Sequence, residues 1–427
     1  MKGHTLDSLG IRTWINAAGY LTRLGGNELP EEVSSAMREA TGVFVDIAEL
    51  QAIAAGIIAR HTGAESGIVT AGATAALTLG AAACMAGLDP ARMDALPHAA
   101  NMPSEFIMMR AHRSSYDHAI RAAGAKIIDV GVNDQALNAG IRRTDTWEIE
   151  SAISEKTAGF AFMATPHNLR ELEVWARLGQ KHGLPVLVDA APWLPPVENL
   201  RLFCDAGASL VAFSGGKAIR GPQASGILCG QKELVASALL QQLDMNVVAD
   251  NWRLPETLLP GGNLTAIPRH GIGRGFKVSK ETIFGLIVAL ERFVARDHEG
   301  EFAEMEGILR AIADGLAGVR GLKTELRSAS TTYRRPALEL HFDEISLGLA
   351  AIDVARQLGQ SSPPIQLTER LIAENILIVD PACLRRQHVS PIVSAIREIL
   401  NQPANHSPFS QGQNNKQGDL KWEKLGN

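Results

Sequence analysis

The feature that most constrains the fold is an alternation of short apolar runs with helical stretches between about Val45 and Gly230. The runs are apolar throughout rather than at every second residue, which is typical of strands in a parallel sheet that is covered on both faces. The sequence therefore predicts an α/β fold with a mainly parallel sheet between layers of helices. The runs expected to form strands are 67–70, 106–110, 126–130, 159–164, 185–189, 210–213 and 226–229.

The order of elements changes along the chain, and this change predicts four segments. Residues 1–48 are expected to form an N-terminal arm with one helix at 31–41, and residues 49–265 a large domain. Residues 266–402, in which two long helices precede further strands and helices, are expected to form a smaller α+β domain. Residues 403–427 are rich in Asn, Gln, Gly, Ser and Lys and cannot bury enough apolar surface to offset the entropy of ordering, so we expect a mobile tail.

Composition argues against several classes of protein. There are 41 Lys and Arg residues against 46 Asp and Glu residues, and this net charge of −5 supplies no basic field for a nucleic acid. The four cysteines stand far apart without a C-x-x-C pair, which indicates reduced thiols in a cytoplasmic protein. No signal peptide is apparent, and the long uncharged run at 66–88 is broken by Thr and Gly, so no membrane span is expected.

Two segments end in groups suited to binding a ligand. At 70–74 an expected strand turns into a helix, whose free amides and dipole favour an anion, and Gly72 would let the backbone approach it closely. The alternative is a plain turn with small residues for packing. The strand at 185–189 ends in Asp189, at the sheet edge where ligands bind in open α/β sheets. Asp189 could also be a helix cap or an ion-pair partner.

In a third segment, 210–226, an expected strand is followed by a glycine-rich turn that contains Lys217. A second expected strand begins directly after this turn. The flanking glycines leave space at the amine, and partial burial would lower its pKa toward that of a free nucleophile. A solvated loop lysine is the alternative. Ser214 stands three residues before the lysine and adds a hydroxyl group.

Together the three segments supply what pyridoxal 5'-phosphate requires: an anion site, a carboxylate and a lysine. The carboxylate would hold the pyridine nitrogen protonated, and the lysine would form the Schiff base. The expected cofactor contacts are Gly72, Ala73, Thr74 and Ser214 at the phosphate, Asp189 at the pyridine nitrogen and Lys217 at the aldehyde carbon.

On these motifs the sequence resembles the fold type I pyridoxal-phosphate enzymes. Within them it is similar to the group of selenocysteine synthase (the seryl-tRNA selenium transferase), which includes the D-glucosaminate-type ammonia-lyases. The resemblance covers most of residues 14–400, and its most specific element is Phe213–Gln223 with Ser-Gly-Gly-Lys. The other resembling segments are 15–19, 22–26, 44–46, 49–51, 70–76, 112–118, 188–191 and 274–282.

The resemblance implies further roles. His112 would stack on the cofactor ring, and Ala191 would be the small residue under its other face. Arg274 and Lys277 fall in the family's R-x-x-R-V-x-K pattern, which supplies an anion pocket, although its second arginine is lysine here.

One further arginine of the family, after the Thr-x-Leu-Gly motif, is replaced here by Gly26. Arg23 is a candidate to compensate for it. The sequence does not decide which residue binds the substrate carboxylate; the candidates are Arg274, Arg334 and Arg335.

The resemblance also implies the reaction, a pyridoxal-phosphate lyase acting on a small β-hydroxy amino acid or amino sugar acid. Lys217 would remove the α-proton, and loss of the β-hydroxyl would lead to a 2-oxo acid and ammonia. A racemase or an aldolase would use the same residues. A selenium transferase on seryl-tRNA is disfavoured, because the motif that follows its tRNA-binding domain begins here at Asn16. A non-catalytic protein of this fold is disfavoured by the intact lysine and aspartate.

The resemblance further implies a homodimer or larger assembly with the active site at the subunit interface. The stretch 255–275 is long and irregular, and long loops in compact domains are usually functional or disordered. It could lie across a partner and bring Arg274 and Lys277 toward the partner's cofactor. The alternative is that it folds over its own domain.

Overall fold

The computed structural model divides into two compact units. The larger contains residues 19–305 and 328–336; the smaller contains residues up to 18, 306–327 and those from 337 onward. The described residues are 5–134, 140–141, 144–165, 168–248, 251–259, 266–330 and 334–401. The predicted tail at 403–427 lies outside them.

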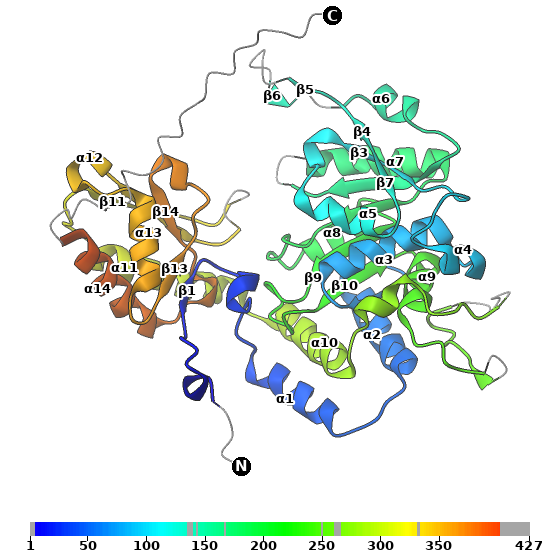
Figure 1. Cartoon of the computed structure of the whole chain (residues 1–427), viewed down its shortest axis with the longest axis horizontal. Helices are drawn as coiled ribbons and strands as arrows, with labels where there is room; N and C mark the ends of the chain where they lie inside the picture. Colours follow the sequence, from blue (N-terminus) through cyan, green and yellow to red (C-terminus); the bar gives the residue numbers. More distant parts are fainter. Residues whose placement is uncertain are drawn as a thin grey trace, which may run out of the picture. The chain divides into compact units, whose positions relative to one another are not determined.

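The larger unit is built around a seven-stranded sheet with the strand order β2-β10-β9-β8-β7-β3-β4 (Figure 1). The five strands from β9 to β4 are parallel to one another. Every apolar run that was predicted to be a strand is one, and the mainly parallel α/β sheet is confirmed. The strands are β2 (Ser66–Thr70), β3 (Glu105–Met109), β4 (Lys126–Val130), β7 (Thr157–Met163), β8 (Val186–Asp189), β9 (Leu210–Ser214) and β10 (Gly226–Gly230).

One strand, β10, runs antiparallel to both of its neighbours, β9 and β2. The loop between β9 and β10 contains no helix that could carry the chain back across the sheet, so the two strands form a hairpin. This hairpin inserts β10 between β2 and β9, and its turn carries Lys217.

Helices cover both faces of this sheet (Figure 1). The helix at Ala73–Ala86, α3, packs across β10, β9, β8 and β7, and its alanines allow that close approach. With it lie α4 (Pro90–Ala95), α5 (His118–Ala122) and α9 (Lys232–Gln242). The other face carries α1 (Glu31–Thr41), α2 (Ile47–Thr62), α7 (Leu169–His182), α8 (Asn199–Asp205) and α10 (Lys280–Ala295). The short elements β5 (Asn133–Asp134), β6 (Gly140–Ile141) and α6 (Thr146–Ser151) complete the unit.

The smaller unit packs helices on a three-stranded sheet with the order β11-β12-β14. Its strands are β11 (Leu322–Arg327), β12 (Ala337–Phe342) and β14 (Ile376–Val379), and its helices are α12 (Glu344–Leu347), α13 (Ala351–Gln360) and α14 (Val389–Asn401). The helix α11 (His298–Gly315) begins in the larger unit and ends in the smaller one.

Two features of the smaller unit were not predicted. Strand β1 (Ile15–Ala17) pairs in parallel with β13 (Ile365–Leu367), and neither three-residue segment has a pattern of its own that identifies it. A short helix, α12, also precedes α13 and was not predicted. Gly348 separates them because its φ of 61° is left-handed and ends the first helix.

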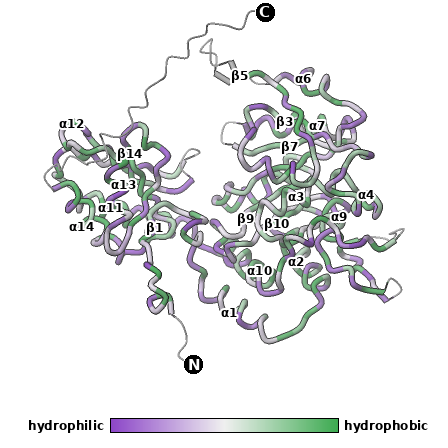
Figure 2. Tube along the Cα trace, in the orientation of Figure 1, coloured by the Kyte–Doolittle hydropathy of each residue, from purple (hydrophilic) through white to green (hydrophobic). Residues whose placement is uncertain are grey.

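The surface helices are amphipathic. In α1 the buried residues Val33, Ala36 and Ala40 recur at helical spacing, and Figure 2 shows hydrophilic and hydrophobic residues alternating along it. A search of the described part of the chain finds no helix with the length and apolar character needed to cross a membrane.

Candidate active site

The helix α3 begins at an open N-terminus. Its N-cap is Gly72, whose φ of 95° suits glycine, and no side chain caps the helix. Gly226 of β10 lies so close that a Cβ there would be 2.5 Å from the Gly72 carbonyl carbon and 2.7 Å from the Ala73 nitrogen. The exposed Thr74 follows in the first turn. An uncapped helix start of this kind suits an anion, and the anion contact stays a prediction.

Asp189 is the last residue of β8 and is partly buried. The backbone N–H of Ala191 donates to Asp189 Oδ1 at 3.0 Å. Burial raises the pKa of Asp189, while the Ala191 amide and the positive charge of Lys217 act in the opposite direction. A cationic group placed beside this carboxyl would offset its desolvation.

Lys217 lies three residues beyond the end of β9, in a turn that is closed on itself. The Gly215 N–H donates to the Ser225 carbonyl, and the Gly221 N–H donates to the Gly215 carbonyl, each at 2.9 Å. Burial lowers the pKa of Lys217, the charge of Asp189 opposes this shift, and the positive charge of Arg334 adds to it. The amine is therefore neutral at lower pH than an ordinary lysine and is a better nucleophile.

The sheet order brings most of the predicted groups to one edge. In the register of the central strands, Gly226 lies between Thr70 and Ser214, so the start of α3 and the Ser214 hydroxyl flank the same residue. Strand β8 with Asp189 is the next neighbour of β9. The groups that share this edge are Gly72, Ala73, Thr74, Asp189, Ala191, Ser214 and Lys217.

His112 is buried at the end of the 3-10 helix η3 (Arg110–His112), with 2% of its surface exposed. Its ring meets Phe162 edge-on with centroids 4.6 Å apart, and its Nε2 lies 2.6 Å from Asn168 Nδ2. Burial lowers the pKa of His112 to about 4. The stacking role stays a prediction, and sequence reasoning did not identify Asn168.

Besides Asp189, the charged group that acts on Lys217 is Arg334. Its guanidinium stacks on the indole of Trp193 with its carbon 4.0 Å from the ring centroid, and it donates to the Pro192 carbonyl. Burial lowers the pKa of Arg334 to about 10, and the neighbouring Arg335 contributes to the shift. Arg335 itself lies over the ring of Tyr20 at 4.7 Å.

The resembling segment at 22–26 packs on the lysine turn. Gln223 Nε2 donates to Thr22 Oγ1 at 3.3 Å, and the Asn27 side-chain amide donates to the carbonyls of Gly216 and Lys217 at 2.6 and 3.3 Å. Arg23 is exposed on the 3-10 helix η2 (Thr22–Leu24) of this segment. Asn27 was not recognised from the sequence.

Arg274 and Lys277 are grouped around a different carboxylate. Arg274, in the 3-10 helix η6 (Ile272–Phe276), donates to the Gln242 carbonyl and to Asp244 Oδ2, each at 3.3 Å. The Asn246 backbone N–H contributes most to lowering the pKa of Asp244, and the charges of Arg274, His270 and Lys277 lower it further. The charged groups that act on Lys217 are Asp189 and Arg334, so the anion pocket predicted from Arg274 and Lys277 stays a prediction.

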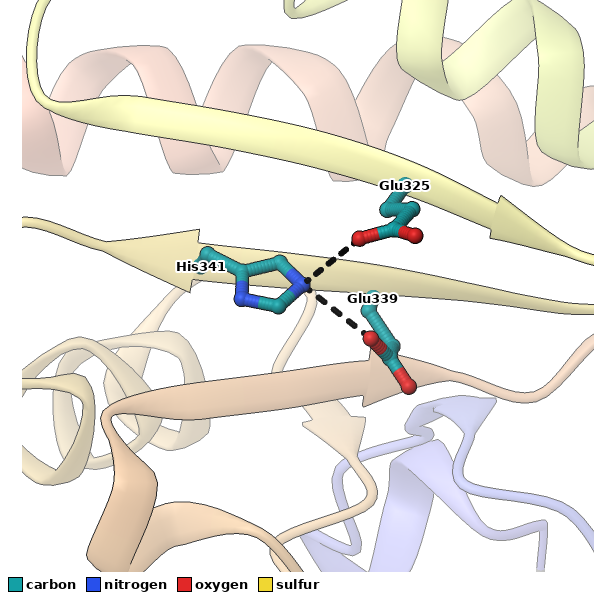
Figure 3. A group of neighbouring side chains, drawn as sticks. All are labelled: Glu325, Glu339 and His341. Carbon is teal, nitrogen blue, oxygen red and sulfur yellow. Dashed lines mark hydrogen bonds and ion pairs between the residues drawn. The ribbon is translucent and has the colours of Figure 1, made fainter.

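A separate cluster in the smaller unit has the residue types of a metal site. Glu325, Glu339 and His341 place one ligand atom each within 4.8 Å of one another (Figure 3). Arg327 pairs with Glu325 at 2.5 Å and with Glu339 at 2.8 Å, so both carboxylates already have a cationic partner. We therefore interpret this cluster as an ion-pair network on the sheet.

The chain is similar in sequence and in structure to known proteins. No protein-family model matches it. A D-glucosaminate-6-phosphate ammonia lyase from Salmonella typhimurium is 28% identical over 412 residues, 95% of this chain and 100% of the relative. A solved structure of a D-glucosaminate-6-phosphate ammonia-lyase matches with a TM-score of 0.76 and 27% identity, over 94% of this chain and 99% of the other.

The chain has the fold type I architecture. A 5'-C-glycyluridine monooxygenase-decarboxylase from Streptomyces is also 28% identical, over 93% of this chain and 92% of the relative. A seryl-tRNA selenium transferase from Serratia proteamaculans is 32% identical over a shorter stretch, 27% of each chain. The resemblance to this group of pyridoxal-phosphate enzymes is therefore confirmed.

The close approach at the helix start predicts a loss of stability for Gly226→Ala. A Cβ there meets backbone atoms of Gly72 and Ala73, which cannot rotate away, so we expect the free energy of unfolding to fall by about 1–3 kcal/mol in urea titrations. Gly56→Ala is the matched control, because Gly56 is an exposed helical residue with open space around it and gains up to about 1 kcal/mol. Equal effects of both substitutions would contradict the close approach.

The buried amine predicts an unusual pH dependence of lysine modification. Because the pKa of Lys217 is lowered, its rate of reductive methylation should level off at lower pH than that of free Nα-acetyl-lysine. Asp189→Asn removes the charge that opposes the shift, so the midpoint should move lower still. Mass spectrometry of the peptide containing Lys217 gives the midpoint independently of its absolute rate. A midpoint that rises in Asp189→Asn would contradict the pairing of these side chains.

Proposed function

We propose that this protein binds pyridoxal 5'-phosphate and is a lyase that releases ammonia and a 2-oxo acid from a small β-hydroxy amino acid or amino sugar acid. The observation that carries the proposal is that two partly buried groups act on each other's charge: Asp189 at the end of β8 and Lys217 in the turn after the neighbouring strand β9. The uncapped start of α3 at the same sheet edge adds a place for a phosphate.

The residues present fit this cofactor. The amides at the start of α3 and the Ser214 hydroxyl would hold its phosphate, and Asp189 would face a protonated pyridine nitrogen, whose charge offsets the desolvation of the carboxyl. Lys217 would hold the aldehyde carbon. Ala191 and His112 would bound the two faces of the ring. When bound, the cofactor supplies the sink for the electron pair that remains when the substrate loses its α-proton.

Each reactive step needs a group that this chain provides. Lys217 Nζ, whose pKa burial lowers, loses its proton at lower pH than an ordinary lysine and in that neutral form can take the α-proton. Arg334 offers its guanidinium to the substrate carboxylate, because it lies close enough to Lys217 to lower the pKa of that residue. Trp193 and the Pro192 carbonyl hold the guanidinium in place. Loss of the β-hydroxyl as water, which carries away the proton that Lys217 took, would leave an enamine, and hydrolysis of the enamine would release ammonia and the 2-oxo acid.

The class of substrate is supported by the ammonia-lyase relative, which acts on a phosphorylated amino sugar acid and aligns over its full length. The Streptomyces monooxygenase-decarboxylase has the same identity and favours a second candidate, an oxygen-dependent decarboxylation. The two reactions differ in their co-reactant, because elimination consumes no oxygen. We place the reaction in the cytoplasm because none of the four cysteines, all of them described residues, forms a disulfide.

The lyase assignment predicts that ammonia and a 2-oxo acid form in equal amounts from a D-glucosaminate-type or small β-hydroxy amino acid substrate, with no uptake of oxygen. Lys217→Ala should abolish both products and the visible absorbance of the bound cofactor while circular dichroism stays unchanged. Lys232→Ala, which removes a lysine at the start of α9, is the control and should keep both. Oxygen uptake with release of carbon dioxide would support the second candidate instead.

We also propose that the protein forms a homodimer or a larger assembly. The segment between α1 and α2 exposes three consecutive apolar residues, Val43, Phe44 and Val45, and Ile53 is exposed on α2. A contiguous apolar surface of this kind usually marks a contact with another protein, and in a symmetric dimer the same surface serves both copies.

This patch predicts the effect of a charge on assembly. Light scattering at micromolar concentration should give at least the mass of a dimer, and Phe44→Asp should lower that mass toward the monomer, because a carboxylate cannot be buried there without a partner. Ile345→Asp is the control, since Ile345 is equally exposed but lies in the smaller unit. A wild-type monomer with full activity would contradict the assembly.

A further inference from the structure

The side-chain amide of Asn168 has a single orientation that satisfies its neighbours. Its Oδ1 accepts a hydrogen bond from the Thr165 backbone N–H at 2.8 Å, and its Nδ2 donates to the Met163 carbonyl, also at 2.8 Å. A flipped amide would set an oxygen against that carbonyl and a donor against that N–H. The backbone therefore decides which end of the amide faces His112.

That orientation decides where the proton of His112 sits. Asn168 Nδ2 lies 2.6 Å from His112 Nε2, and because an amide NH₂ can only donate, Nε2 must accept. A neutral imidazole that accepts at Nε2 carries its hydrogen on Nδ1. Burial lowers the pKa of His112 to about 4, which supports a neutral ring at physiological pH.

The Nδ1–H that follows has no partner of its own. His112 Nδ1 is buried, and no acceptor for it exists among the residues that the structure describes. A buried donor left without an acceptor costs about 1–3 kcal/mol. The aromatic rings of Phe162 and Trp175, which pack near the imidazole, offer no oxygen to it. An enclosed donor of this kind calls for an acceptor from beyond the described residues.

We propose that Asn168 is a positioning residue that holds His112 in the Nδ1–H form, so that this buried N–H donates to an oxygen of bound pyridoxal phosphate. The inference rests on the proposed function. The inference deepens the proposed function, because it gives His112 a directed hydrogen bond to the cofactor in addition to the stacking contact with its ring. The position of Asn168 in the fold supports this role. Its amide donates to the carbonyl of Met163, and Met163 pairs in the sheet with Asp189, the residue that we assign to the pyridine nitrogen.

The test is the tautomer itself, observed in protein without cofactor. Protein with ¹⁵N-labelled histidine gives long-range ¹H–¹⁵N spectra that distinguish Nδ1–H from Nε2–H, and His112→Gln identifies the His112 signals among those of the 12 histidines. We expect the Nδ1–H pattern for His112. The Nε2–H pattern would overturn the inference.

Two substitutions separate positioning from general packing. Asn168→Asp places an acceptor opposite Nε2 and should move the proton to Nε2, and Asn168→Ala should leave a mixture of tautomers. Asn199→Ala is the matched control, because it also removes an amide that donates to a backbone carbonyl, that of Trp193 at 2.7 Å, but should leave the His112 spectrum unchanged. If Asn168→Asp fails to fold, the wild-type and Asn168→Ala spectra decide the question.

Addition of pyridoxal 5'-phosphate tests the second half of the inference. A new hydrogen bond should shift the Nδ1 resonance of His112 and slow exchange of its proton. If the cofactor gives its visible band and the Nδ1 signal does not move, an enclosed water satisfies the donor and the inference is wrong while the proposed function stands. If no visible band forms at all, the proposed function fails irrespective of the tautomer.

Discussion

The burial of Lys217 beside Asp189 is the constraint on which the site depends. Burial raises the pKa of the carboxyl and lowers that of the amine, while their mutual attraction opposes both shifts. Such a pair is poor evidence for stabilisation, because removing two charged groups from water costs several kcal/mol per ion. We propose that these two groups, placed after two largely apolar strands, instead serve chemistry that needs an amine and a carboxyl group within reach of one ligand.

The sheet supplies the geometry that this pair requires. In the register of β8 and β9, Asp189 pairs with Ala212, so the two functional side chains leave neighbouring strands at the same edge. The hairpin that carries Lys217 also inserts β10 beside β2, and Gly226 lets it touch the start of α3. One reversal of chain direction thus places the amine and the anion site on the same edge of the sheet.

Much of this arrangement could be predicted from the sequence, since continuous apolar runs identify buried strands and the ends of such strands share an edge. Lys217, Asp189 and the start of α3 followed from that rule. Asn168 and Asn27 did not, because their partners lie 56 and 189 residues away and an isolated asparagine has no pattern that indicates a tertiary contact. Strand β1 was missed for the same reason, since its partner β13 is near the other end of the chain. Arg334 was one of three candidate arginines, and its stacking on Trp193 and its effect on Lys217 are the reasons we propose it for the substrate carboxylate.

The central claim is that Lys217 and no other lysine holds the cofactor, and covalent trapping tests it most directly. The protein is incubated with pyridoxal 5'-phosphate, reduced with borohydride to fix the cofactor as a stable secondary amine, digested and analysed by mass spectrometry. The account predicts one modified peptide per chain, the one that contains Lys217. Modification at another lysine, or uniform low modification across exposed lysines with none at Lys217, would contradict it.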